Sequence, residues 1–216
     1  MITRPLLSRP AVGHDAAPPA GLTGRQVRLR AVVPADRHTL TGFDRAAARG
    51  GSPRVGGYRH WAAHRAADAG GGVQFAIETL HSRILVGSLW TGQADPRSDR
   101  FSYGIGIGAQ HRRCGYAADA ITMLLAFMFD ERGYGECEVG VHAGNTASLT
   151  LHGALGFREE DRLRDTELPR GRVDHVVRMR ITAYEFAQLQ PTLVAARPSR
   201  GRHWRPRRGR HWQVRL

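Results

Sequence analysis

The chain contains the segment RRCGYA at residues 112–117, between two segments of clear and different character. Residues 101–107 (FSYGIGI) precede it and are typical of a strand whose glycines allow a close approach by another group. Residues 115–132, which overlap the end of this segment, carry apolar side chains at helical spacing. Gly133 then ends the predicted helix. The segment is therefore predicted to be a turn that leads from a strand into a long helix.

A turn in this position has the properties of an anion-binding site. The first N–H groups of a helix lack intrahelical partners, and the helix dipole places positive charge there. Gly115 lets a ligand come close to the backbone, and Arg112 and Arg113 add charge. The residues predict a ligand that carries a pyrophosphate, and the alternative is an ordinary connection with surface arginines. The chain has neither a G-x-G-x-x-G fingerprint nor a P-loop.

On both sides of this segment, predicted strands and helices alternate along the chain. Period-two alternation or short apolar runs predict strands, and capping residues with apolar spacing predict helices. The expected strands are residues 26–33, 74–79, 84–90, 101–107, 136–141 and 174–181. The first expected helix begins at Pro34, and three others cover residues 58–69, 115–132 and 147–155. A last short helix is expected to begin with a capping box formed by Thr182 and Glu185. This order predicts an α+β fold with one mixed, mostly antiparallel sheet flanked by helices.

The two ends differ in composition from the centre. Residues 1–23 are rich in Pro, Ala and Gly and are expected to form a flexible arm, and residues 24–189 to form one domain. Residues 190–216 are expected to be a disordered tail, in which RGRHW occurs twice. From Val194 onward the tail holds eight Arg and no acid, out of a formal net charge of +13. Such a tail either binds nucleic acid without sequence preference or is a solvated extension.

Composition narrows the class of protein. Hydrophobic residues make up 41%, which is enough for a packed core. Two cysteines, Cys114 and Cys137, do not form a disulfide scaffold and suit a reducing cytoplasm. No apolar run is long enough to cross a bilayer, so no membrane partner is expected. Neither the cysteines nor the eleven histidines have metal-ligand spacing, and no metal is expected.

The ordered motifs resemble those of the GNAT N-acetyltransferase superfamily. Arg112-x-x-Gly115-x-Ala117 is similar to its R/Q-x-x-G-x-G/A signature. Residues 145–148 (NTAS) and 151–157 (LHGALGF) resemble the N-x-x-S and L-x-x-x-x-G-F block of the branch that includes ribosomal-protein N-terminal acetyltransferases. The resemblance extends over about residues 24–189. It implies a GNAT-like fold and acetyl-CoA as the cosubstrate.

The resemblance also implies roles for particular residues. In such proteins two central strands splay apart and pantetheine lies in the gap. The residues that would bind the cofactor are Ile105, Ile107, Arg112, Arg113, Cys114, Gly115, Tyr116, Ala117 and Asn145. Many members use a tyrosine to protonate the thiolate, and His152 stands at that position, which is a departure from the pattern. In the resembled branch the serine of N-x-x-S has this role, so Ser148 and His152 are the candidate catalytic residues.

Two questions stay open at this point. The general base is not identified, and Glu78, Tyr103, Glu138 and His142 are candidates only because they lie on strands expected near the cleft. An α-amine with a pKa of about 8 needs no dedicated base. The expected function is acetyl transfer to a primary amine of a small molecule or a protein N-terminus, by a monomer or homodimer. The alternative is a non-catalytic module with a CoA-binding fold whose tail binds nucleic acid or an acidic partner.

Overall fold

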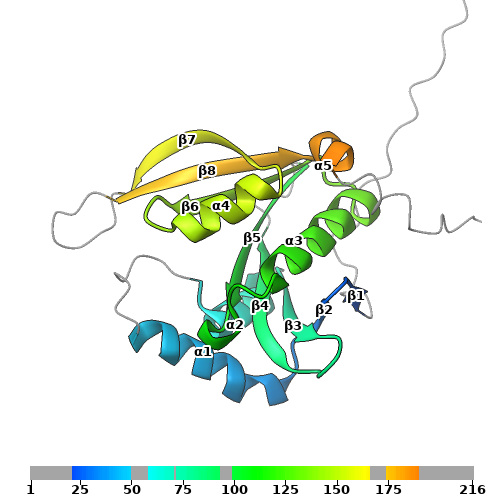
Figure 1. Ribbon diagram of the computed structural model, residues 1–216, viewed down its shortest axis with the longest axis vertical. Coiled ribbons are helices and arrows are strands. Elements are labelled where there is room, and N and C mark those ends of the chain that lie inside the picture. Colours follow the sequence, from blue (N-terminus) through cyan, green and yellow to red (C-terminus); the bar gives the residue numbers. More distant parts are fainter. Residues whose placement is uncertain (1–20, 50–57, 71, 93–98, 166–173, 190–216) are drawn as a thin grey trace, which may run out of the picture.

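The computed structural model describes residues 21–49, 58–70, 72–92, 99–165 and 174–189 (Figure 1). The expected tail and all but the last residues of the expected arm lie outside this part of the chain. Leu22 and Thr23, which close the expected arm, form a short strand against the next one. The described residues therefore begin slightly before the expected start of the domain at residue 24.

One eight-stranded sheet organises the molecule. Its order is β1-β2-β3-β4-β5-β6-β8-β7, and every pair is antiparallel except β5 with β6. The strands are β1 (Leu22–Thr23), β2 (Val27–Ala31), β3 (Val73–Thr79), β4 (Leu85–Gly92), β5 (Arg100–Ile107), β6 (Glu136–His142), β7 (Arg158–Asp165) and β8 (Asp174–Thr182). The predicted mixed, mostly antiparallel sheet is confirmed.

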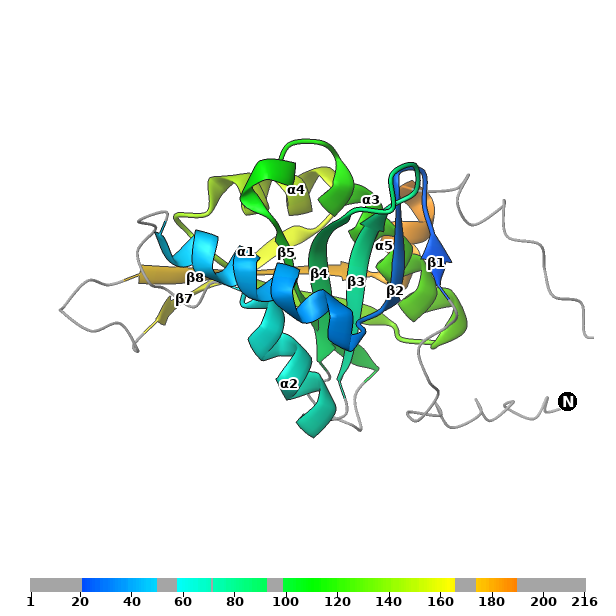
Figure 2. The same cartoon turned by 90° about the horizontal axis from the view of Figure 1, so that it is seen from below.

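Helices cover both faces of the sheet. They are α1 (Arg37–Arg49), α2 (His60–Gly70), α3 (Tyr116–Ala126), α4 (Thr146–Ala154) and α5 (Ala183–Leu189). A 3-10 turn, η1 (Pro34–Asp36), leads into α1, and a π-helical turn, η3 (Phe127–Glu131), extends α3. Figure 2 shows α1 and α2 on one side of β3–β5, with α3 and α4 on the other.

The core lies between the sheet and α3. The buried face of α3 presents Ile121, Leu124 and Leu125, which are fully buried. They belong to one apolar cluster with Leu29 of β2 and Phe101 of β5. Burial of such side chains contributes about 1.5–3 kcal/mol each relative to leaving them in water. The helix that carries the predicted anion-binding turn is thereby fixed against the sheet.

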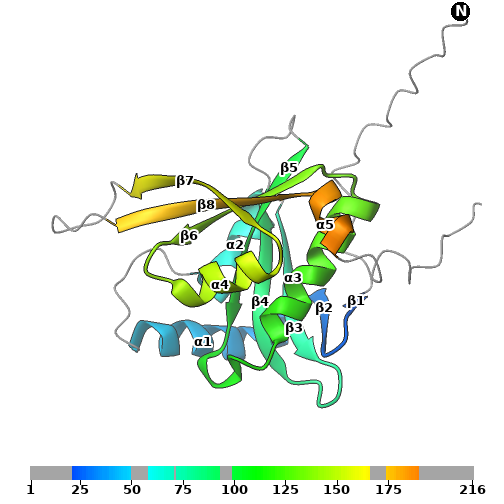
Figure 3. The ribbon, with the colours of Figure 1, turned by 45° about the horizontal axis from the view of Figure 1, so that its top comes forward.

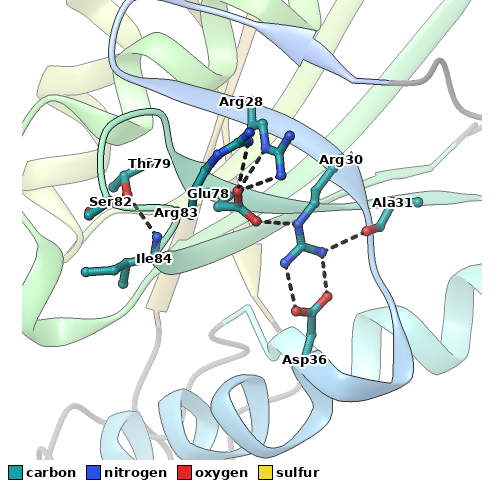
Figure 4. Close-up of polar contacts among 9 residues, drawn as sticks. All are labelled: Arg28, Arg30, Ala31, Asp36, Glu78, Thr79, Ser82, Arg83 and Ile84. Carbon is teal, nitrogen blue, oxygen red and sulfur yellow. Dashed lines mark hydrogen bonds and ion pairs between the residues drawn. The ribbon is translucent and has the colours of Figure 1, made fainter.

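A charged cluster anchors the other face at β2 and β3 (Figure 4). The Glu78 carboxylate is 5% exposed and accepts from Arg28 Nε at 2.9 Å and from Arg30 Nε at 2.6 Å, with Arg83 at 3.4 Å. Arg30 also donates two hydrogen bonds to Asp36, at 2.8 and 2.9 Å. Burial alone would raise the pKa of Glu78, but the two arginines outweigh it and the pKa lies below its usual value. The cluster ties η1 to the sheet.

We expect Glu78→Gln to lower the free energy of unfolding by about 2 kcal/mol, below the 3–5 kcal/mol of a fully buried pair because the arginines keep some contact with water. A carboxylate with a lowered folded pKa stabilises the fold above its unfolded pKa, and this contribution is lost as the pH falls through the folded value. The variant should therefore lose less stability than the wild type on acidification below about pH 4. Urea unfolding at pH 7 and pH 3.5 measures both effects. Glu159→Gln, which breaks an exposed pair with Arg162, is the control and should change little.

Candidate active site

The two central strands separate soon after they meet. β5 and β6 pair only through Arg100 with Glu136 and Phe101 with Cys137. Beyond these pairs β5 stays with β4 as far as Ile107, while β6 stays with β8 as far as His142. Figures 1 and 3 show the two strands diverging, with α4 beside the opening. The sheet therefore has an internal edge along the second half of β5.

The backbone of β5 presents hydrogen-bonding groups to this opening. The N–H of Gly108 donates to Val86 of β4 at 2.9 Å, so alternate residues of β5 face β4 and the others face away. By this alternation the N–H and C=O groups of Ile105 and Ile107 point to the side of β6. The carbonyl of Ile107 accepts from Arg112 Nε at 3.2 Å. Both predicted strand positions thus offer backbone groups to an extended ligand.

The segment at residues 112–117 forms the expected turn at the start of α3. Arg113 and Gly115 have φ values of 63° and 82°, and Gly115 is the N-cap residue. Residues 112 to 115 are exposed, and Tyr116 and Ala117 are half-buried. Among the described residues outside helices and strands, no backbone hydrogen bond has its donor at residue 114 or 115, and the N–H groups of Tyr116 and Ala117 lack an intrahelical partner because these residues begin α3. The turn therefore has free donors, positive charge and access from solvent.

Asp119 lies in the first turn of α3 but does not occupy this anion site. Its carboxylate accepts from the backbone N–H groups of Arg25, Gln26 and Val27, at 3.1, 2.7 and 3.0 Å. These bonds direct its charge toward the start of β2. The acid thus secures the helix to the sheet and leaves the positive end of α3 open.

α4 begins at the opposite side of the opening. Asn145 is its N-cap, and the Asn145 side chain accepts from the Ser148 N–H at 3.1 Å. Ser148 is half-buried, and its Oγ lies 3.3 Å from His152 Nδ1. His152 itself is 3% exposed, with Nε2 at 2.8 Å from the Tyr103 hydroxyl of β5. The structure thus brings Ser148 and His152 together and joins them to β5.

The glycines of β5 have close neighbours from another part of the chain. The sequence indicates a close approach by another group at Gly104 and Gly106, and the groups that approach are side chains at the start of α2. A Cβ atom at Gly104 would lie 2.6 Å from the ring of Tyr58, and one at Gly106 would lie 2.7 Å from His60. The glycines are needed because two aromatic rings rest directly on the strand.

These rings belong to a buried polar cluster that the sequence does not indicate. Ser88 Oγ lies 2.7 Å from His60 Nδ1 and 3.1 Å from the Tyr58 hydroxyl, and the Gln74 amide donates to the His60 carbonyl at 2.6 Å. Burial lowers the pKa of His60 to about 4, so the ring is neutral at pH 7. The cluster joins the start of α2 to β3 and β4 through contacts between residues 14 to 30 positions apart, so no local motif indicates it.

The sequence profile described as Acetyltransferase (GNAT) domain matches residues 26–158. The chain belongs to this family. Among curated relatives, the uncharacterized N-acetyltransferase YokL of the Bacillus subtilis (strain 168) SPbeta prophage is 30% identical over 102 residues, 47% of this chain. The uncharacterized N-acetyltransferase p20 of Bacillus licheniformis is 27% identical over 114 residues, 53% of this chain. The matches span 58% and 64% of those two proteins.

Solved structures share the GNAT fold. The spermidine/spermine N-acetyltransferase SpeG from Vibrio cholerae superposes with a TM-score of 0.63 at 18% identity, covering 76% of this chain and 98% of SpeG. A GCN5-related N-acetyltransferase from Brucella melitensis gives 0.64 at 20% identity, with 79% and 82% coverage. A proposed ribosomal-protein-serine acetyltransferase from Vibrio cholerae gives 0.61 at 18% identity, with 77% and 99% coverage.

The four candidate bases have different surroundings in the structure. Glu78 is held by three arginines away from the opening, and Tyr103 is buried against His152, which raises the pKa of its hydroxyl well above the usual value. Glu138 pairs with Arg178 at 3.6 Å, and His142 is half-buried at the end of β6. None of the four is an unpaired carboxylate in the opening.

Two features are absent from the residues that the structure describes. None of the helices in this part of the chain has the length and apolar character needed to span a membrane. Within the same residues, no three His, Cys, Asp or Glu side chains are grouped as metal ligands would be.

Proposed function

We propose that the chain transfers the acetyl group of acetyl-CoA to a primary amine. The observation that carries this proposal is the opening between β5 and β6, which is lined by strand backbone on one side and leads to an uncovered, positively charged helix start. A pantetheine chain has two amides that can pair with a strand, and it ends in a pyrophosphate. Both chemical features of the cosubstrate thus find matching groups in one continuous path along the protein.

The cosubstrate is proposed to lie along the predicted residues. The backbone of Ile105 and Ile107 would pair with the pantetheine amides. Since Ile107 already accepts from Arg112, that side chain would share the carbonyl or turn toward the phosphates. The pyrophosphate would bind the donors of residues 112–117 (RRCGYA), and Asn145 would contact the pantetheine or the far end of the cofactor.

The reaction needs one bond formed and one broken. The neutral amine attacks the thioester carbon, so the C–N bond forms and the C–S bond breaks. The amine loses a proton to water, and the thiolate gains one from the Ser148 hydroxyl, which regains a proton from water. Proton transfer by a positioned side chain contributes about 10²–10⁴-fold in general. Ser148 is assigned this role because it lies at the exposed end of α4, whereas His152 is buried.

The acceptor is proposed to be a protein N-terminus or a small-molecule amine. SpeG acts on spermidine and spermine by its name, and another neighbour is described as acting on a ribosomal protein, so both acceptor classes occur on this fold. We also propose a cytoplasmic location, since Cys114 and Cys137 are both free thiols. The alternative, a non-catalytic CoA-binding module, is favoured mainly by the histidine at position 152.

A thiol-release assay tests the function. Acetyl-CoA is incubated with the full chain and a panel that contains spermidine, amino acids and peptides with Ser or Ala at the N-terminus. We expect amine-dependent release of CoA with at least one class, and mass spectrometry should show 42 Da added to the acceptor as an acetyl group. Acetyl-CoA that binds in calorimetry without release with any amine would favour the non-catalytic module.

The Arg-rich tail is proposed to be separate from acetyl transfer. This proposal rests on composition, because residues 190–216 lie outside the described chain, and it assigns the enzyme to residues 24–189. Removal of residues 198–216 takes away seven Arg and should leave the thermal midpoint and acetyl transfer unchanged. It should abolish most of any nonspecific nucleic-acid binding, which in the full chain should fall steeply with salt. A truncated protein that melts several degrees lower, or that changes its oligomeric state, would show that the tail is structural.

A further inference from the structure

A hydrogen-bonded chain of three polar side chains, those of Tyr103, His152 and Ser148, connects β5 to α4 beneath the opening. The Tyr103 hydroxyl lies 2.8 Å from His152 Nε2, and His152 Nδ1 lies 2.7 Å from the Ser148 carbonyl oxygen and 3.3 Å from Ser148 Oγ. The rings of Tyr103 and His152 are also stacked, with centroids 5.9 Å apart and an interplanar angle of 23°. Tyr103 is only two residues beyond Phe101, where β5 and β6 last pair.

The donors and acceptors in this chain have only one consistent assignment. A carbonyl oxygen can only accept, so His152 Nδ1 must carry the hydrogen in its 2.7 Å bond to Ser148. Burial lowers the pKa of His152, which keeps the ring neutral, so Nε2 has a lone pair. Nε2 therefore accepts from the Tyr103 hydroxyl.

This assignment fixes the role of the Ser148 hydroxyl. Because Nδ1 already carries a hydrogen, Ser148 Oγ can only accept from it. Among the described residues, Ser148 Oγ has no other hydrogen-bond partner. The hydroxyl hydrogen is thus free to point into the opening. A directed chain of this kind also polarises each member, which makes the last hydroxyl a better donor.

We propose that Tyr103 and His152 are positioning residues that orient the Ser148 hydroxyl as a hydrogen-bond donor to the departing thiolate. This inference rests on the proposed function. In this inference Tyr103 of β5 acts together with His152, the residue that departs from the family pattern. The histidine does not replace the tyrosine acid of other members; it connects Ser148 to a tyrosine from another element. With 3% of its surface exposed and both ring nitrogens bonded, His152 does not itself reach the thiolate.

A double-mutant cycle tests this coupling. Tyr103→Phe removes one hydroxyl and keeps the stacked ring. In the wild-type background it should lower kcat about three- to tenfold, with the KM for acetyl-CoA changed less than twofold, since the chain acts in the transition state. In a Ser148→Ala background the same substitution should change kcat less than twofold, because the group it acts through is gone. An equal loss in both backgrounds would show that Tyr103 contributes only to packing.

Conservative variants at position 152 give an independent measurement. The side-chain amide of His152→Asn can place its nitrogen near the position of Nδ1 and donate to the Ser148 carbonyl. His152→Leu, of similar bulk, cannot. The Asn variant should retain severalfold more kcat than the Leu variant when near-ultraviolet circular dichroism shows both to be folded. Equal activities would overturn the role of His152.

Nitrogen-15 spectra of the histidines test the tautomer without any acceptor. The His152 ring, identified by its loss in His152→Asn, should be protonated at Nδ1 and not at Nε2. An Nε2–H tautomer would overturn the inference even in an active enzyme. A wild-type protein that releases no thiol with any amine would overturn the proposed function, and the inference with it. An active wild type with an additive cycle would overturn the inference alone.

Discussion

Gly115→Asp should weaken acetyl-CoA binding by well over tenfold. A carboxylate at this position would lie beside the proposed pyrophosphate site and repel it. Gly115 also has a φ of 82°, which side chains rarely adopt, and a Cβ there would lie 3.3 Å from Gln26 Nε2. A factor of ten corresponds to about 1.4 kcal/mol, and two like unit charges about 4 Å apart near a protein surface repel by about 4 kcal/mol. Calorimetry with acetyl-CoA measures the change directly.

Gly115→Asn separates the two causes. Asparagine has nearly the shape of aspartate, carries no charge and is among the residues that best tolerate positive φ. It should bind acetyl-CoA several times more tightly than the Asp variant. If a folded Asp variant binds as the wild type does, the turn at residues 112–117 is not the pyrophosphate site. If both variants bind equally weakly, shape rather than charge is responsible.

Ser148→Ala should lower kcat by about a hundredfold, the low end of what general acid catalysis contributes. The KM for acetyl-CoA should rise much less, because a donor to the thiolate acts mainly in the transition state. Steady-state kinetics with an acceptor found in the amine panel give both constants. Thr150→Ala, an exposed position on the same helix, is the matched control and should leave both unchanged.

His152→Ala indicates whether the roles are reversed. The structure leads us to expect a smaller loss of kcat than for Ser148→Ala, accompanied by lower stability because a buried ring is removed. Loss of all activity in a folded His152→Ala variant, with full activity in Ser148→Ala, would make His152 the acid. The buried ring would then have to become accessible during turnover.

Most of the fold could be predicted because its signals are local. β2 alternates buried Val27 and Leu29 with arginines, and α3 has apolar residues at helical spacing. The predicted capping box is also present, with Thr182 N–H donating to Glu185 at 3.0 Å and Glu185 N–H donating back at 3.2 Å. Each signal depends on residues within a few positions of one another, which is the range that a single sequence reveals.

Two strands were missed for the opposite reason. β7 has the sequence REEDRLRD, in which only Leu163 is apolar, so no alternation indicates a strand. It forms because β8 pairs with it from Arg158 with Arg180 to Asp165 with Asp174, with one register shift between Glu159 and Asp161. β1 is only two residues long and likewise depends on its partner. Strands at a sheet edge can be charged because one side faces water.

The candidate site also has a part that could be predicted from the sequence and a part that could not. The turn at residues 112–117 forms at the start of α3 as predicted, because its signal is contiguous, but its role in binding stays a proposal. The contact of Tyr58 and His60 with the β5 glycines could not be predicted, since it joins residues more than forty positions apart. Glycines in residues 101–107 were a correct signal of close approach, but they did not indicate which group approaches.

The separation of β5 from β6 places an open strand edge in the interior of a sheet. An exposed edge usually invites another polypeptide to pair with it, which leads to aggregation. Here the edge lies inside the fold: α4 stands over it, and Tyr103 and His152 close its inner end at 2.8 Å. We expect this arrangement to exclude a neighbouring protein chain and to admit a slender molecule with only a few amides. The same feature that creates a pairing surface also restricts what can pair there.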